Sequence, residues 1–92
     1  MTKDYCIGRV ELADQEADIL DLGYYVQAFD DTKGRVVYGI KIEKTDTIGN
    51  TSSEETWGLT YSYDEAEGWA RKMAAGTVTP LSLFAITDDL MG

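Results

Sequence analysis

Hydrophobic and polar positions alternate most clearly over residues 36–42, where every second residue is apolar. A second run rich in β-branched and aromatic residues covers residues 24–29, and Asp-Asp-Thr-Lys-Gly at residues 30–34 separates the two. Two such runs around a short polar segment with Gly predict an antiparallel β-hairpin. One face of this hairpin is continuously apolar and the other turns polar, as expected of a sheet with one solvated face. The apolar face is expected to hold Tyr24, Val26, Ala28, Val36, Tyr38, Ile40 and Ile42.

The pattern predicts two further strands, at residues 4–12 and 56–61, with a polar loop at residues 46–55 before the second of them. Within the first strand, Gly8 indicates a bulge or a close backbone approach. Simple alternation divides this strand into Tyr5, Ile7 and Arg9 on one face and Cys6, Gly8, Val10 and Leu12 on the other. The acidic connection over residues 13–22 fits either a helical turn or a loop.

Helical signals follow at residues 63–75 and again from Thr79. Ser62 and Glu65 have the spacing of a capping box, and Gly76 is a typical helix stop. Thr79 followed by Pro80 predicts the start of a second helix, because proline fits the first helical position. The element order is therefore β-β-β-β-α-α. We expect a single domain over residues 1–92 of the α+β class, with an antiparallel sheet of about four strands packed by two C-terminal helices.

The chain is strongly acidic, with 17 Asp and Glu against 8 Lys and Arg and a net charge of -9. Such a surface repels nucleic-acid phosphates and anionic membranes and attracts basic surfaces. We therefore expect no direct binding of nucleic acid or membrane. The expected partner is a basic protein surface, such as that of a nuclease or another nucleic-acid-binding protein. The acids expected to contact it are Asp14, Glu16, Asp18, Asp21, Asp30, Asp31, Glu54, Glu55, Asp88 and Asp89.

Catalytic chemistry finds little support in the sequence. The chain has no histidine, so the most common general base and metal ligand is missing. Its one cysteine, Cys6, is interpreted as a small core residue, and no spacing of acids matches a calcium loop. We expect no enzyme activity, catalytic residue, metal or cofactor; a carboxylate-based enzyme would need two acids converging on one concave site.

A lone cysteine cannot form an internal disulfide, which favours a reducing compartment, and no apolar run approaches the roughly 18 residues of a membrane helix. We expect a cytoplasmic protein, either a monomer or a homodimer.

Two segments resemble a family of small uncharacterised proteins from Gram-positive bacteria. They are Tyr-Gly-Ile-Lys-Ile-Glu at residues 38–43, and Thr-Pro-Leu-Ser-Leu at residues 79–83 with Asp-Asp-Leu at residues 88–90. The resemblance implies a strand meander, then a helix, then a closing helix that starts at a proline. The closing helix of that family usually carries a histidine after the proline, which this chain lacks.

These observations favour a non-enzymatic acidic binding protein that occupies a basic surface of a larger partner. A sharper form is a phage-type inhibitor or nucleic-acid mimic, as in anti-CRISPR proteins. One alternative is an interaction or assembly domain that binds through an apolar aromatic patch, with Trp57, Tyr61, Tyr63 and Trp69 as candidates. That alternative requires the side chains of Trp57 and Trp69 to be exposed to a partner. The expected role of each is instead to pack between the sheet and a helix. Another alternative is an uncharacterised housekeeping protein of Gram-positive bacteria.

Overall fold

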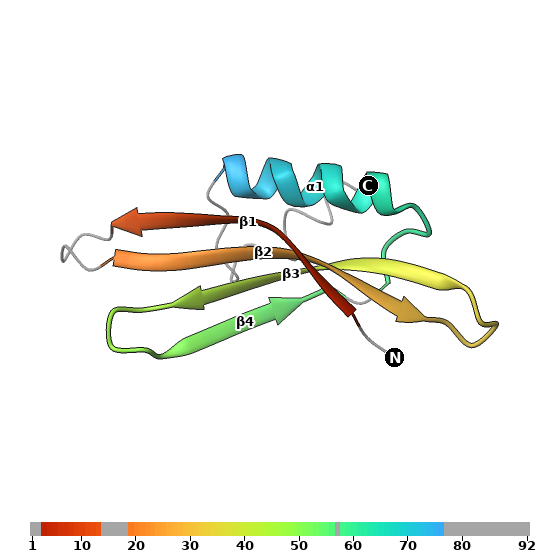
Figure 1. Cartoon of the computed structure of the whole chain (residues 1–92), viewed down its shortest axis with the longest axis horizontal. Helices are drawn as coiled ribbons and strands as arrows, with labels where there is room; N and C mark the ends of the chain where they lie inside the picture. The colour runs from red at the N-terminus through yellow and green to blue at the C-terminus, as the bar shows by residue number, and fades with distance from the viewer. Residues whose placement is uncertain (1–2, 14–18, 57, 77–92) are drawn as a thin grey trace.

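The protein is an antiparallel four-stranded sheet with a helix packed on one face (Figure 1). This computed structural model describes residues 3–13, 19–56 and 58–76. Its elements are β1 (Lys3–Ala13), β2 (Ile19–Asp30), β3 (Val36–Thr45), β4 (Thr51–Glu55) and α1 (Tyr63–Ala75). The α+β class and the four antiparallel strands are confirmed. Within the described residues α1 is the only helix, and the second helix expected from Thr79 lies outside them.

The β2–β3 hairpin forms where the alternation predicted it. Asp30 pairs with Val36 at its closed end, and Gly34 adopts a positive φ of 78° in the turn. That conformation is unfavourable for residues with a Cβ, which explains the glycine. Most of the predicted apolar face is confirmed, because Tyr24, Val26, Ile40 and Ile42 are fully buried and Ala28 is 8% exposed. Val36, at the hairpin end of that face, is 42% exposed instead.

The fourth strand lies in a different place from the one the sequence suggested. Residues 51–55, expected to be loop, form β4 and pair with β3 from Thr45↔Thr51 to Lys41↔Glu55. The described part of residues 56–61, expected to be the strand, forms the isolated bridge Tyr38↔Thr60 and no strand. An exposed edge strand needs no hydrophobic face, so its Thr-Ser-Ser-Glu-Glu sequence carries no alternation to detect.

A β-bulge in β1 overturns the expected division of its faces. Cys6 pairs with Tyr25 while Gly8 pairs with Tyr24, so Ile7 is an extra residue in the ladder. The insertion reverses the alternation. The side chains that pack toward α1 are therefore Tyr5 before the bulge, Ile7 within it, and Val10 and Leu12 after it. Cys6 is turned to the opposite face and is exposed, so its interpretation as a core residue was wrong.

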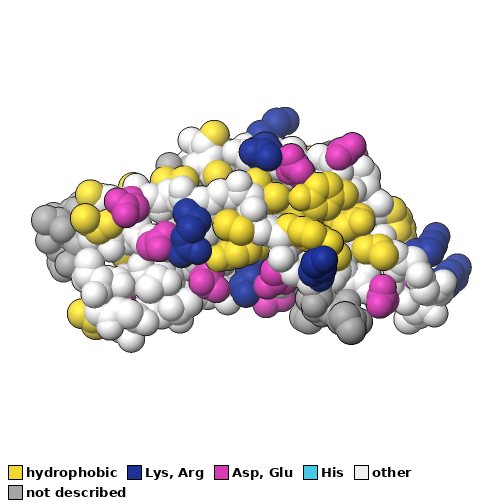
Figure 2. Space-filling model, in the orientation of Figure 1, with side chains coloured by type: hydrophobic (Ala, Val, Ile, Leu, Met, Phe, Trp, Pro, Cys, Tyr) yellow, Lys and Arg dark blue, Asp and Glu magenta, His cyan; other side chains and the backbone are white. Residues whose placement is uncertain are grey.

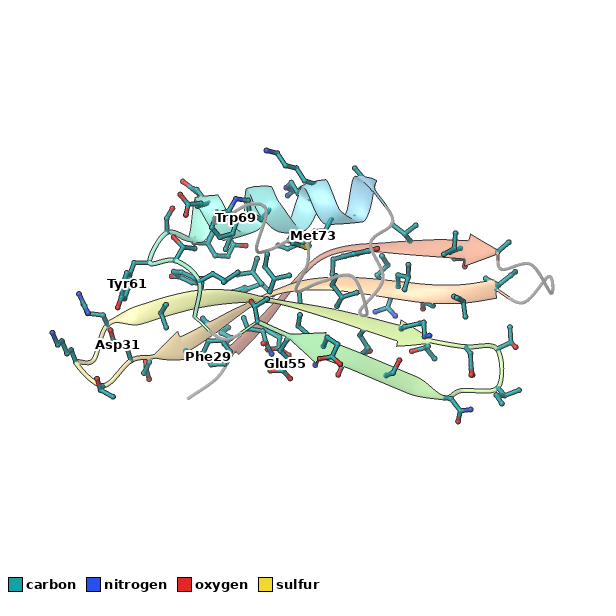
Figure 3. All side chains as sticks on the ribbon, turned by 180° about the vertical axis from the view of Figure 1, so that it is seen from behind. Phe29, Asp31, Glu55, Tyr61, Trp69 and Met73 are labelled. Carbon is teal, nitrogen blue, oxygen red and sulfur yellow. The ribbon has the colours of Figure 1, made fainter. Side chains whose placement is uncertain are left out.

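Helix α1 begins and packs largely as its sequence indicates. The Ser62 Oγ accepts a hydrogen bond from the Glu65 amide at 3.2 Å, but the Ser62 amide donates to Thr60 Oγ1, so the capping box is only half formed. Ala66 and Ala70 are fully buried over Val26 of β2, because their small side chains allow close approach to the sheet. Trp69 and Met73 project from α1 toward the part of the core formed by Leu22, Tyr24, Ile40 and Ile42 (Figure 3).

Candidate functional site

The ten acids expected to contact a partner do not form one patch among the described residues. Asp14, Glu16, Asp18, Asp88 and Asp89 lie outside the part of the chain that the structure describes. Asp21 and Asp31 lie ten positions apart along or just beyond β2, which corresponds to about 33 Å of extended chain. Glu54 and Glu55 alternate on β4, so their side chains leave opposite faces of the sheet.

Asp21 belongs to a charged cluster on the face of the sheet that points away from α1. It accepts a hydrogen bond from Arg9 Nη2 at 2.8 Å, and Arg9 Nη1 donates to the Tyr25 hydroxyl at 3.0 Å. The Asp21 carboxylate, followed by the Tyr25 hydroxyl, raises the pKa of Arg9 further above its usual value. Gly23 leaves room for this arrangement, since a Cβ there would lie 2.9 Å from the Tyr25 ring.

Lys41 extends the same charged face on β3. Its Nζ lies 3.6 Å from Asp4 Oδ2 and 3.7 Å from Glu43 Oε2, and it also lies over the Tyr25 ring at 5.7 Å from the centroid. Asp4 in turn accepts a hydrogen bond from Gln27 Nε2 at 3.1 Å. The cations of this face are therefore already engaged by carboxylates of the chain.

Asp31 organises the tip of the β2–β3 hairpin. Its carboxylate accepts hydrogen bonds from the amides of Lys33 and Arg35 at 2.8 and 2.9 Å. It also accepts from Arg35 Nε at 3.1 Å and from the Tyr61 hydroxyl at 3.2 Å (Figure 3). The backbone hydrogen bond from Arg35 is the main cause that lowers the pKa of Asp31. This acid thus ties the hairpin to the segment that leads into α1.

The feature that sequence reasoning missed is a groove at the hairpin end of the sheet, on the same side as α1. It encloses about 260 Å³ and is lined mainly by Lys3, Tyr5, Ala28, Val36 and Tyr38. In the space-filling view, hydrophobic side chains gather between the first turns of α1 and the hairpin end (Figure 2). Tyr63 of α1 contacts the rings of both Tyr5 and Tyr38 edge-on, at centroid distances of 5.5 and 5.6 Å.

The aromatic residues proposed as an apolar patch have separate roles. Trp69 packs against the core, as expected, and Trp57 lies outside the described residues. Tyr61 is 56% exposed, and its ring stacks with the Arg35 guanidinium, whose Cζ lies 4.5 Å from the ring centroid. Tyr63 contacts two residues that line the groove, Tyr5 and Tyr38. Desolvation, followed by the nearby Glu67 carboxylate, raises the pKa of Tyr63.

The described residues contain no group of three or more Cys, Asp or Glu side chains placed to hold a metal ion. No helix among them has the length and apolar character needed to cross a membrane.

Comparison with known proteins gives one match, to a family of unknown function, and it covers both of the short segments that carry the resemblance seen in the sequence. No curated protein matches the chain, and no solved structure matches it either. Residues 3–92 match a family of unknown function, DUF6514, so the chain belongs to that family.

Proposed function

We propose that the protein is a small, non-enzymatic binding protein that occupies a basic surface of a larger partner. The contact is made by its acidic end, the end of the sheet where β1 and β2 are joined. We further propose that it acts in the cytoplasm of a Gram-positive bacterium. The sharper form of the proposal is an inhibitor of phage type that takes the place of nucleic acid on a nuclease or CRISPR effector.

The observation that carries this proposal is the state of the three arginines. Arg9, Arg35 and Arg71 each bind a carboxylate of the same chain, at 2.8, 3.1 and 3.0 Å respectively. Arginine is the side chain best suited to bidentate binding of phosphate, so its internal pairing counts against a nucleic-acid-binding role. Acids, in contrast, outnumber bases by nine over the whole sequence.

The acidic end is where β1 and β2 are joined. Glu11 and Asp21 are direct cross-strand neighbours there, and like charges so placed repel each other. The connecting residues 14–18 add three more acids in the sequence. Arg9 offsets only part of this charge. A basic partner would relieve the repulsion and would be steered toward this end at low salt.

The test compares two variants of equal charge. Glu16→Gln/Asp18→Asn reduces the negative charge of the connection, whereas Asp64→Asn/Glu65→Gln removes as much at the start of α1. Proteins captured from a lysate at about 50 and 500 mM salt are identified and their affinities measured. We expect the first variant to lose roughly three- to tenfold in affinity at low salt, mainly in the association rate, and the second to lose much less. Equal effects of the two variants, or an affinity indifferent to salt, would contradict the proposal.

A second candidate function, association through an apolar aromatic surface, is favoured by the groove of Tyr5, Ala28, Val36 and Tyr38. It requires a complex that persists at high salt. The salt series above separates it from the acidic proposal, because apolar association does not weaken as ionic strength rises.

A further inference from the structure

The groove at the hairpin end is built around a small residue between larger neighbours. Ala28 of β2 pairs with Tyr38 on one side and with Lys3 on the other, and Tyr5 follows two positions along β1. Because Ala28 has only a methyl group, the space above it is open between the neighbouring side chains. The resulting volume of about 260 Å³ falls below the roughly 300–1,000 Å³ of pockets that hold cofactors or drug-sized ligands. It suits a single long side chain instead.

The aromatic walls of the groove, Tyr5 and Tyr38, are held in place by Tyr63 in the absence of a ligand. Tyr63 meets Tyr5 at an interplanar angle of 78° and Tyr38 at 76°, both edge-to-face contacts. The three tyrosines also pack against the buried cluster of Val26, Ala66 and Ala70. Rigid aromatic walls lose little conformational entropy on binding, which favours recognition by this surface.

A cation already lies on one of these walls. Lys3 Nζ is positioned over the Tyr5 ring, 5.2 Å from the centroid, within the distance at which the ring face attracts a positive charge. Lys3 is exposed, and its ammonium group lies at the end of a flexible aliphatic side chain, so this group can move off the ring. The acidic side chain of Asp30 also lines the groove, and the net charge of -9 disfavours an anionic guest.

We infer that this groove is a subsite for a lysine or arginine side chain of the partner, with its cationic end replacing Lys3 on the tyrosine walls. The inference rests on the proposed function, since it identifies the partner as basic, but it concerns a different surface. A basic side chain offers both an apolar stem for Ala28 and Val36 and a charge for the ring faces.

The direct test uses small probes and NMR of the tyrosine rings. The probes are the Nα-acetyl methylamides of arginine and lysine, with those of citrulline and norleucine as uncharged controls of similar length. We expect the charged probes to shift the resonances of Tyr5 and Tyr38 and to bind at least about threefold tighter than the controls. Equal binding of norleucine would identify a merely apolar groove and would overturn the inference, as would the absence of shifts.

Two variants separate this subsite from the acidic end. Lys3→Gln removes the resident cation without touching the core, and should raise the affinity for the arginine probe about two- to threefold. Unchanged or weaker binding would contradict the replacement of Lys3. Ala28→Leu fills the groove and should abolish probe binding, with the fold checked by circular dichroism. If Ala28→Leu leaves partner affinity unchanged while Glu16→Gln/Asp18→Asn reduces it, the groove is not a subsite for the partner and the proposed function stands. If Ala28→Leu reduces partner affinity while Glu16→Gln/Asp18→Asn leaves it unchanged, the role of the acidic end is rejected and the subsite stands.

Discussion

Replacement of Met73 by alanine tests the packing that holds α1, and with it Tyr63, against the sheet. Met73 is 1% exposed and belongs to the cluster of Leu22, Tyr24, Ile40 and Ile42. The substitution removes the side chain beyond Cβ, and burial of the equivalent of two to three methylene groups contributes about 2 kcal/mol. The cavity left behind adds to this cost, and measured methionine-to-alanine changes in protein cores span roughly 2–5 kcal/mol. We expect Met73→Ala to lower the free energy of unfolding by about 3 kcal/mol.

The matched control is Lys72→Ala on the same helix. Lys72 is exposed, so its replacement should change the free energy of unfolding by no more than about 0.5 kcal/mol. Unfolding in urea is followed by tryptophan fluorescence and by circular dichroism, and coincident curves establish a two-state transition. With a slope of about 1.5 kcal/mol per molar urea, within the usual range of about 1–3 for small domains, the midpoint of Met73→Ala should fall by about 2 M. A loss no larger than that of Lys72→Ala would refute the packing of α1 through Met73 and would also remove the support for the tyrosine walls.

Three further predictions concern the hairpin tip and the exposed face of the sheet. The pKa of Asp31 is lowered in the folded protein, so its stabilising effect is present at neutral pH and is lost progressively as the pH falls below 3.8 and through the lower pKa of the folded state. The urea midpoints of the parent protein and Asp31→Asn should therefore differ at pH 6, and the difference should shrink as the pH is lowered below 3.8; a constant difference would count against the role of its charge. Cys6 is exposed, so a thiol reagent should label one equivalent in the native protein without denaturant, and labelling only after unfolding would show that the face is covered. Gly23→Ala brings a Cβ to 2.9 Å from the Tyr25 ring, so the ring must move and its hydroxyl loses the hydrogen bond from Arg9. We expect this to lower the free energy of unfolding by about 1 kcal/mol. In a Tyr25→Ala background the cost of Gly23→Ala should disappear, and an unchanged cost would show that it arises from the backbone.

The sequence predicted the elements whose signals are local. The β2–β3 hairpin has alternation on both strands and a polar turn, and α1 has an N-cap, an apolar stripe and a glycine stop within fifteen residues. Both were confirmed. β4 was missed because an edge strand gains its hydrogen bonds from β3 and needs no apolar face of its own. The alternation of Trp57, Leu59 and Tyr61 was instead a misleading pattern, since among the residues of that segment that the structure describes only Thr60 forms a bridge.

The candidate sites depended on positions that no local pattern could supply. One extra residue, Ile7, reverses the faces of β1 and thereby moves Cys6 outward and places Tyr5 and Val10 on the same side. The groove forms only when β1, β2 and β3 pair in the observed register, with Ala28 between Lys3 and Tyr38. It also depends on α1, whose Tyr63 contacts the tyrosine rings. Asp31 was selected for its charge, but its role follows from the geometry of the turn and from Tyr61, thirty residues later in the chain.

The two surfaces proposed to contact a partner lie at opposite ends of the sheet, which makes their contributions separable. Ala28 and Asp21 are seven positions apart on β2, about 23 Å of extended strand. Effects of substitutions at such separations add in free energy. The losses caused by Ala28→Leu and by Glu16→Gln/Asp18→Asn should therefore multiply in the combined variant. They should also differ in kind, because long-range steering by exposed acids is screened by salt, whereas a side chain enclosed between tyrosine rings is screened much less. A complex with a basic partner should thus lose its fast association at high salt while keeping a slow dissociation that Ala28→Leu removes.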